Sequence, residues 1–178
     1  IYYTMKKIDS LGRATFHYIP PHPVSSITER EEVWLRHIMR HGPQSTLYLH
    51  ELTKDTHKCE QTARVQLRKL RKGGFIQLPP QQRATENANN NRWVWELAPA
   101  ALAYLKDRDL WENCIRPHGH WTHAYMTSCS TSSIDIEAHK AGVEYMPGHL
   151  VLERAQVPFE AVIRGKKLIP DQLFGLDY

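Results

Sequence analysis

Apolar and polar positions alternate with a helical period along residues 59–72. Ala63, Leu67 and Leu70 stand at positions i, i+4 and i+7, so in a helix their side chains share one face. The polar and basic residues between them fall on the other faces. We therefore predict an amphipathic helix that buries its leucines and exposes its cations.

The segments on either side of this helix complete a pattern typical of a winged helix-turn-helix between residues 46 and 97. A short apolar segment leads to a turn at residues 53–56, and Gly73-Gly74 ends the helix. Two β-favouring segments follow, separated by a polar loop. They are residues 75–78 and 92–97.

Another helix is predicted upstream of this segment. Thr28 and Glu31 have the spacing of a capping box, and the helical pattern ends near His41. Its expected buried stripe consists of Val33, Leu35, Ile38 and Met39. We interpret residues 1–23, which end in a proline cluster, as an N-terminal arm, and place the winged-helix domain at residues 24–115.

Residues 116–178 combine a long helical pattern with several β-like segments, which predicts a second, smaller α/β domain. Its helix is expected over residues 121–141, despite a middle rich in Ser and Thr. The β-like segments are residues 143–146, 150–154, 159–163 and 168–174. The predicted fold class of the whole chain is α/β (α+β), with the winged helix preceding the smaller domain.

Positive charge is concentrated in the first part of the chain. Residues 1–117 contain 18 Lys and Arg against 12 Asp and Glu, whereas residues 118–178 contain 5 against 7. Residues 54–72 alone contain seven basic and two acidic side chains. A local basic stripe attracts polyanions, and leucines at helical spacing distinguish this one from a disordered tail. Double-stranded DNA is the partner that this pattern favours.

Side chains on the exposed faces of the predicted recognition helix suit base edges and phosphates. The predicted DNA-binding residues of the helix are Gln61, Thr62, Arg64, Arg68, Lys69 and Lys72. In the polar loop, Arg83 and Arg92 are candidates for contact with the minor groove or with phosphates. Two alternatives stay open: a merely solvated helix face with a disordered loop, and a winged helix that connects proteins.

Cysteine usage and hydropathy indicate the compartment. Cys59, Cys114 and Cys129 are odd in number and far apart, so they predict neither a disulfide framework nor a paired-cysteine zinc site. No apolar run approaches membrane-spanning length, and no signal peptide is visible. We expect a protein of the bacterial cytoplasm, associated with the nucleoid or a plasmid and with no membrane partner.

The dipeptide Pro170-Asp171, at the start of an apolar segment, is the sharpest chemical feature of the second half. A metal-dependent nuclease binds Mg²⁺ or Mn²⁺ through two acidic side chains. The first lies at a strand end, the second lies on the adjoining strand, and a lysine stands two residues after the second. Asp171 fits the first position and Glu153 is a second catalytic candidate, although Ala155 occupies the lysine position. Pro-Asp is also common in turns and at strand entries, and this alternative stays open.

Histidines offer another candidate for a metal site. His118, His120 and His123 fall within six residues, and imidazoles ligate transition metals. His120 and His123 are the proposed ligands. Their place beside a Pro-Gly break also suits capping or packing at a helix start. The sequence supports no firm cofactor assignment, and a divalent metal, Mg²⁺ or Mn²⁺, stays open as the cofactor of the nuclease alternative.

Taken together, these motifs resemble the replication-relaxation family of plasmids, phages and integrative elements, over residues 46–178. The resembling residues are Leu67, Leu70, Gly74, Phe75 and Ile76 of the winged helix, His120-Trp121-Thr122-His123, Glu153, and residues 168–174. The resemblance implies an N-terminal winged helix joined to a restriction-endonuclease-like domain. It also implies a role in plasmid mobilisation or replication.

Three functional hypotheses follow. The first is a sequence-specific DNA-binding protein of a mobile element, acting in replication, relaxation or conjugative mobilisation, as a homodimer or with other replication or mobilisation proteins. The second is a divalent-metal nuclease or relaxase that uses Asp171. The third is a winged-helix transcriptional regulator. For the 178 residues we expect binding without cleavage, because the second acid and the lysine of a nuclease site would have to follow Tyr178.

Overall fold

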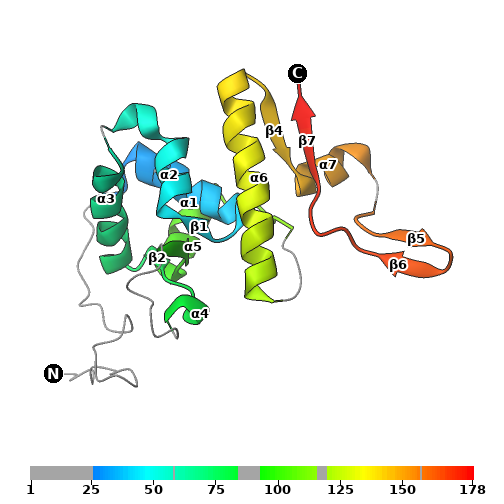
Figure 1. Ribbon diagram of the computed structural model, residues 1–178, viewed down its shortest axis with the longest axis horizontal. Helices are drawn as coiled ribbons and strands as arrows, with labels where there is room; N and C mark the ends of the chain where they lie inside the picture. The colour runs from blue at the N-terminus through cyan, green and yellow to red at the C-terminus, as the bar shows by residue number, and fades with distance from the viewer. Residues whose placement is uncertain (1–25, 58, 84–92, 116–119, 157) are drawn as a thin grey trace. The chain divides into compact units, whose positions relative to one another are not determined.

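The computed structural model shows an α+β protein with small antiparallel sheets (Figure 1). The structure describes residues 26–57, 59–83, 93–115, 120–156 and 158–178. The chain divides into two compact units. Unit 1 comprises Ile1–Ile38 and Pro43–Trp111, and unit 2 comprises Met39–Gly42 and Glu112–Tyr178. The predicted arm, residues 1–23, lies outside the described residues.

Helix α1 (Glu29–His41) begins with the predicted capping box. The backbone N–H of Thr28 donates to Glu31 Oε2 at 2.8 Å, and the Glu31 N–H donates to Thr28 Oγ1 at 3.4 Å. These bonds pair donors that the first turn of a helix leaves open. The other helices of unit 1 are α2 (Thr46–Leu52), the 3-10 helix η1 (Lys54–Thr56), α3 (Glu60–Lys72), α4 (Pro80–Arg83) and α5 (Pro99–Asp107).

Three short strands of unit 1 form an antiparallel sheet in the order β1-β3-β2. They are β1 (Gln44–Ser45), β2 (Ile76–Gln77) and β3 (Val94–Leu97). The strands predicted at residues 75–78 and 92–97 are therefore present as the shorter β2 and β3. These two strands pair with each other, and Gln77 lies opposite Glu96. Gln77 Nε2 donates to Glu96 Oε1 at 2.8 Å across this pair. The sequence did not predict β1.

Two fully buried tryptophans, Trp34 and Trp95, anchor the core of unit 1. The indole N–H of Trp34 donates to the carbonyl oxygen of Leu49 at 2.8 Å. That of Trp95 donates to Thr46 Oγ1 at 2.9 Å. A buried indole N–H needs such a partner, so these bonds fix α2 against α1 and β3.

The buried face of α1 differs from the predicted stripe at one position. Leu35, Ile38 and Met39 are buried as predicted, but Val33 is 39% exposed. Trp34, the next residue, is buried instead. Adjacent residues of a helix point about 100° apart, so burial of Trp34 turns Val33 toward solvent. The larger indole removes more apolar surface from water than valine would.

Unit 2 is built on the long helix α6, which spans the predicted residues 121–141. Its elements are α6 (Trp121–Ala141), β4 (Glu144–Pro147), α7 (Gly148–Ala155), β5 (Ala161–Ile163), β6 (Lys166–Leu168) and β7 (Phe174–Asp177). Strand β4 pairs antiparallel with β7, and β5 pairs antiparallel with β6. The predicted segments 143–146 and 159–163 correspond to β4 and β5.

Two strand predictions for unit 2 are wrong. Residues 150–154 lie in helix α7, because a short apolar run fits a helix face as well as a strand. Residues 168–174 are not one strand: β6 ends at Leu168 and β7 begins at Phe174. Pro170 has no N–H to donate to a ladder, which explains the interruption. Asp171 therefore lies in the connection between two strands of different sheets.

Candidate nucleic-acid interface

Helix α3 has one buried and one exposed face, as its sequence predicts. Ala63, Leu67 and Leu70 are fully buried. The candidates that are exposed on the other faces are Gln61, Arg64, Arg68, Lys69 and Lys72, and Thr62 is half-buried. Gln61, Arg68 and Lys72 lie near the centre of the exposed face, opposite the leucines. This face carries donors and positive charge toward solvent.

Contacts at both ends hold α3 in place. At the start, Arg30 of α1 donates from Nε to Thr56 Oγ1 at 2.6 Å and from Nη1 to Gln66 Oε1 at 2.9 Å. One guanidinium thus joins the turn before α3 to the helix itself. At the end, Gly74 has φ +76°, and the Phe75 N–H donates to the Leu70 carbonyl at 3.0 Å, as in a Schellman motif.

The cations of α3 have different surroundings. Arg64 pairs with Glu60 on the same helix at 2.8 Å. Lys69 Nζ lies 3.3 Å from Oε1 of Glu31, whose side chain is fully buried. Lys69 therefore compensates a buried carboxylate that also accepts the capping bonds of α1.

Aromatic contacts define the surroundings of two arginines. The guanidinium of Arg68 lies 5.3 Å from the ring centre of Trp93, next to β3, and that of Arg71 lies 5.5 Å from it. Such stacking holds a guanidinium without neutralising its charge. No local pattern in the sequence indicates the role of Trp93, because its contact with α3 depends on the pairing of β3.

Two side chains near the start of α3, Cys59 and His57, have lowered pKa values. The pKa of the Cys59 thiol is lowered by hydrogen bonds with Thr62 and the backbone of Gln61. His50 Nδ1 lies 2.7 Å from His57 Nε2. Desolvation by burial, followed by the nearby charges of Arg30 and His50, lowers the pKa of His57. The spacing of these histidines in the sequence gives no indication of this pair.

The remaining candidates of unit 1 lie in or beside the polar loop. Arg83 is the last residue of α4, but its side chain is not described, and Arg92 lies outside the described residues. Their assignment as DNA contacts stays a prediction.

Two candidates of unit 2 come together although they are far apart in the sequence. His123 Nε2 lies 3.1 Å from Asp171 Oδ1, and the Asp171 side chain is 70% exposed. His120 precedes α6 as its N-cap residue, and Glu153 lies exposed on α7. We predicted His123 and Asp171 as members of two separate sites, whereas in the structure they form an ion pair when the imidazole is protonated.

A comparison of the sequence with family models identifies the protein class. The model described as replication-relaxation matches residues 35–177, which include α3, His123 and Asp171. The chain belongs to the replication-relaxation family. No curated protein and no solved structure matches this chain. In the described part of this replication-relaxation protein, no helix is long and apolar enough to cross a membrane.

Glu112, Cys114 and His149 are a group of possible metal ligands in unit 2 of the replication-relaxation protein. One ligand atom from each lies within 4.8 Å of the others. However, Arg40 donates to both carboxylate oxygens of Glu112, at distances of 2.7 to 3.0 Å. A guanidinium in this position repels a cation and occupies the oxygens that would bind it. The group is best explained as an ion-pair cluster, extended by His149 at 3.5 Å from Glu112.

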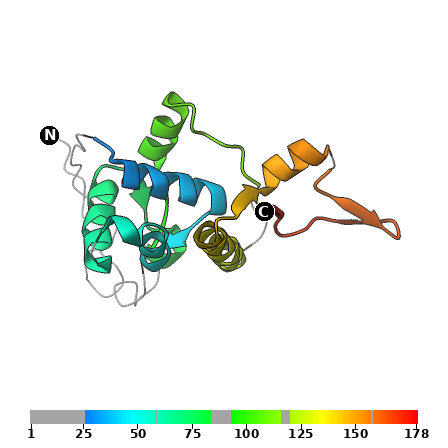
Figure 2. The same ribbon diagram turned by 90° about the horizontal axis from the view of Figure 1, so that it is seen from above.

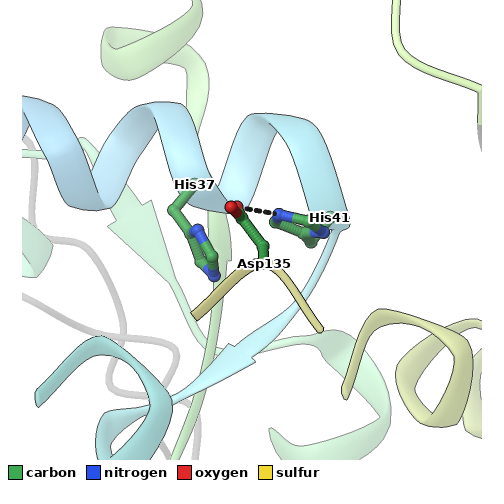
Figure 3. A group of neighbouring side chains, drawn as sticks. All are labelled: His37, His41 and Asp135. Carbon is green, nitrogen blue, oxygen red and sulfur yellow. Dashed lines mark hydrogen bonds and ion pairs between the residues drawn. The ribbon is translucent and has the colours of Figure 1, made fainter. Parts of the chain in front are cut away.

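A buried polar contact joins the end of α1 to α6. His41 is 3% exposed and lies 2.9 Å from Thr131 Oγ1 and 2.8 Å from Asp135 Oδ2. Figure 3 shows the imidazole of His41 against the Asp135 carboxylate, with His37 one turn earlier on α1. Both ring nitrogens of His41 have partners, which satisfies a buried histidine. Thr131 is 3% exposed, so this arrangement serves packing rather than chemistry on a substrate.

Proposed function

We propose that this replication-relaxation protein binds double-stranded DNA, and that unit 1 acts as a winged helix-turn-helix with α3 as its recognition helix. The order of elements supports this proposal. Helix α2, the turn formed by η1 and helix α3 are followed by the paired strands β2 and β3. In a helix-turn-helix, the second helix enters the major groove.

The exposed face of α3 is the observation that carries the proposal. The fully buried Ala63, Leu67 and Leu70 fix the rotation of the helix, so Arg68 and Lys72 point away from the core. An α-helix fits the major groove, and arginine can donate two hydrogen bonds to a guanine edge. We infer sequence-specific binding in the replication, relaxation or conjugative mobilisation of a plasmid or other mobile element.

The nuclease alternative has less support from the geometry. Mg²⁺ and Mn²⁺ prefer oxygen ligands, whereas Asp171 lies beside the imidazole of His123. Among the described residues, the groups of three or more potential metal ligands include neither Asp171 nor Glu153, and neither His120 nor His123. We therefore propose that the protein binds DNA rather than cleaving it. Nicking of a supercoiled plasmid with added magnesium or manganese, lost in Asp171→Ala, would replace this proposal by the nuclease one.

Fluorescence anisotropy with a labelled DNA duplex tests the proposal. Lys72→Ala, on the exposed face of α3, should weaken binding and reduce the slope of log affinity against log salt by about 1. Lys106→Ala removes an exposed lysine from α5 of the same unit and is the matched control. Equal effects of the two substitutions would contradict an interface on α3.

A further inference from the structure

The β5–β6 hairpin of unit 2 is a two-stranded arm with a tight turn. Ala161 pairs with Leu168 and Ile163 with Lys166, which leaves Arg164 and Gly165 as the turn. Both turn residues have positive φ, 51° and 74°. Two positive values define a type I′ turn, whose twist matches that of the flanking strands. Residues 161–168 therefore have the backbone geometry of a regular two-residue hairpin.

Every residue of the two strands is exposed. Val162 is 71% exposed, Ile163 54% and Leu168 50%. Within unit 2 the hairpin extends beyond α7 and the β4–β7 pair in both views (Figures 1 and 2). An isolated two-stranded hairpin is marginally stable in water, and β-branched and leucine side chains gain by burial. These properties indicate a surface that a partner covers.

Charge at the tip identifies the class of partner. Arg164, Lys166 and Lys167 follow one another around the turn, and Glu160 at the base pairs with Lys167. The tip therefore carries a net positive charge and attracts a polyanion. A second copy of this chain would bring the same positive tip, and like charges repel. Charge complementarity therefore favours nucleic acid over self-association.

We propose that the β5–β6 hairpin is a second DNA-binding element, which enters a groove of the duplex independently of α3. A two-stranded β-ribbon fits the major groove. Proteins that read DNA with β-strands place the strands in the major or the minor groove. Arginine and lysine supply many of the phosphate contacts in protein–DNA complexes, and apolar side chains can contact the thymine methyl group in the major groove. Here Arg164 and Lys166 contact phosphates, while Ile163 and Leu168, which share a strand face with Lys166, lie toward the bases. The inference rests on the proposed function, because it adds a contact to the same ligand.

The sequence offers a substitution that removes charge and keeps the hairpin. Arg164→Asn creates Asn-Gly, the preferred pair for a type I′ turn, so the turn should be retained or strengthened. Combined with Lys166→Gln, it neutralises two cations at the tip. Arg154→Gln is the matched control, because Arg154 is an exposed arginine on α7 of the same unit.

Binding of the full chain to a short mixed-sequence duplex is measured by anisotropy as a function of salt. The double variant should bind on the order of ten-fold more weakly at low salt and lose about 2 from the salt slope. The Arg154→Gln control should bind like the parent. Unchanged binding of the double variant, with Lys72→Ala still weakened, would overturn the hairpin proposal alone.

Two further outcomes separate this inference from the proposed function. If the parent chain does not bind duplex DNA at all, both proposals fail. If sedimentation shows that the double variant loses a dimer that the parent forms, and an enforced dimer regains full DNA binding, the hairpin binds a second copy rather than DNA. That result would also overturn the inference.

Discussion

The contacts of individual α3 side chains determine how much each can contribute to the proposed DNA binding. Lys69 faces the buried Glu31, and Arg64 pairs with Glu60. Arg68 lies over Trp93, which leaves its charge available. A cation that already pairs with an acidic side chain gains less binding free energy from a phosphate, because the new ion pair competes with the existing one.

Substitution of two neighbouring cations tests this difference. Arg68→Ala should cost about 1–3 kcal/mol of binding free energy if the side chain contacts a base. Lys69→Ala should cost less than about 1 kcal/mol of binding, and should instead lower the free energy of unfolding, because Glu31 loses its partner. Anisotropy and urea denaturation measure the two quantities. A larger binding loss for Lys69→Ala would mean that the DNA lies against the opposite edge of α3.

We expect His57, in the histidine pair before α3, to make the stability of unit 1 depend on pH. The pKa of His57 is lowered in the folded protein, so the unfolded chain takes up this proton at higher pH. The free energy of unfolding is therefore fully retained above the ordinary pKa of about 6.5 and decreases as the pH falls below it. Urea denaturation across this range checks the direction. His57→Gln should remove part of the dependence, and an unchanged pH profile would exclude His57 as its source.

Among the helices, α3 gives the sharpest test of packing. Leu67 is fully buried, so Leu67→Ala should cost roughly 2–5 kcal/mol of unfolding free energy through lost burial and a cavity. Val65 is 56% exposed on the same helix, and Val65→Ala is the matched control, with little expected change. If thermal denaturation ranks the two variants in the opposite order, α3 has the other rotation and its DNA-facing residues change.

The start of α7 depends on a glycine. A Cβ atom at Gly148 would lie 2.5 Å from the carbonyl oxygen of Leu173, which is closer than real contacts allow. Gly148→Ala should therefore destabilise unit 2 by roughly 1–3 kcal/mol, although alanine is the better helix former. Chemical denaturation measures the loss. A stabilised variant would show that the connection before β7 moves away without cost.

Helices were predictable from the sequence where their own pattern determines them. The leucine spacing and the Gly-Gly end of α3 predicted its span to within one residue, and the helix predicted at residues 121–141 is α6. The strand predicted at residues 150–154 is helix α7, because three consecutive apolar residues do not distinguish the two periods. Contacts between segments, such as Trp93 with Arg68 or His123 with Asp171, depend on tertiary structure and had no local pattern.

At the scale of the whole molecule, the family match and the candidate sites extend over both units. The match to the replication-relaxation family covers residues 35–177, so it includes α3 of unit 1 and the hairpin of unit 2. Each unit presents one basic element, α3 or the β5–β6 tip. If both elements bind one duplex, as we propose, the linked second contact raises the affinity without new contacts at the first.

Photo-crosslinking of the full chain to a duplex, followed by mass spectrometry of the linked peptides, tests the central claim most directly. The account predicts crosslinks within α3, at or beside Arg68 and Lys72, that disappear at high salt or with excess unlabelled duplex. Crosslinks confined to other elements of unit 1, such as α5, with none on α3, would contradict it.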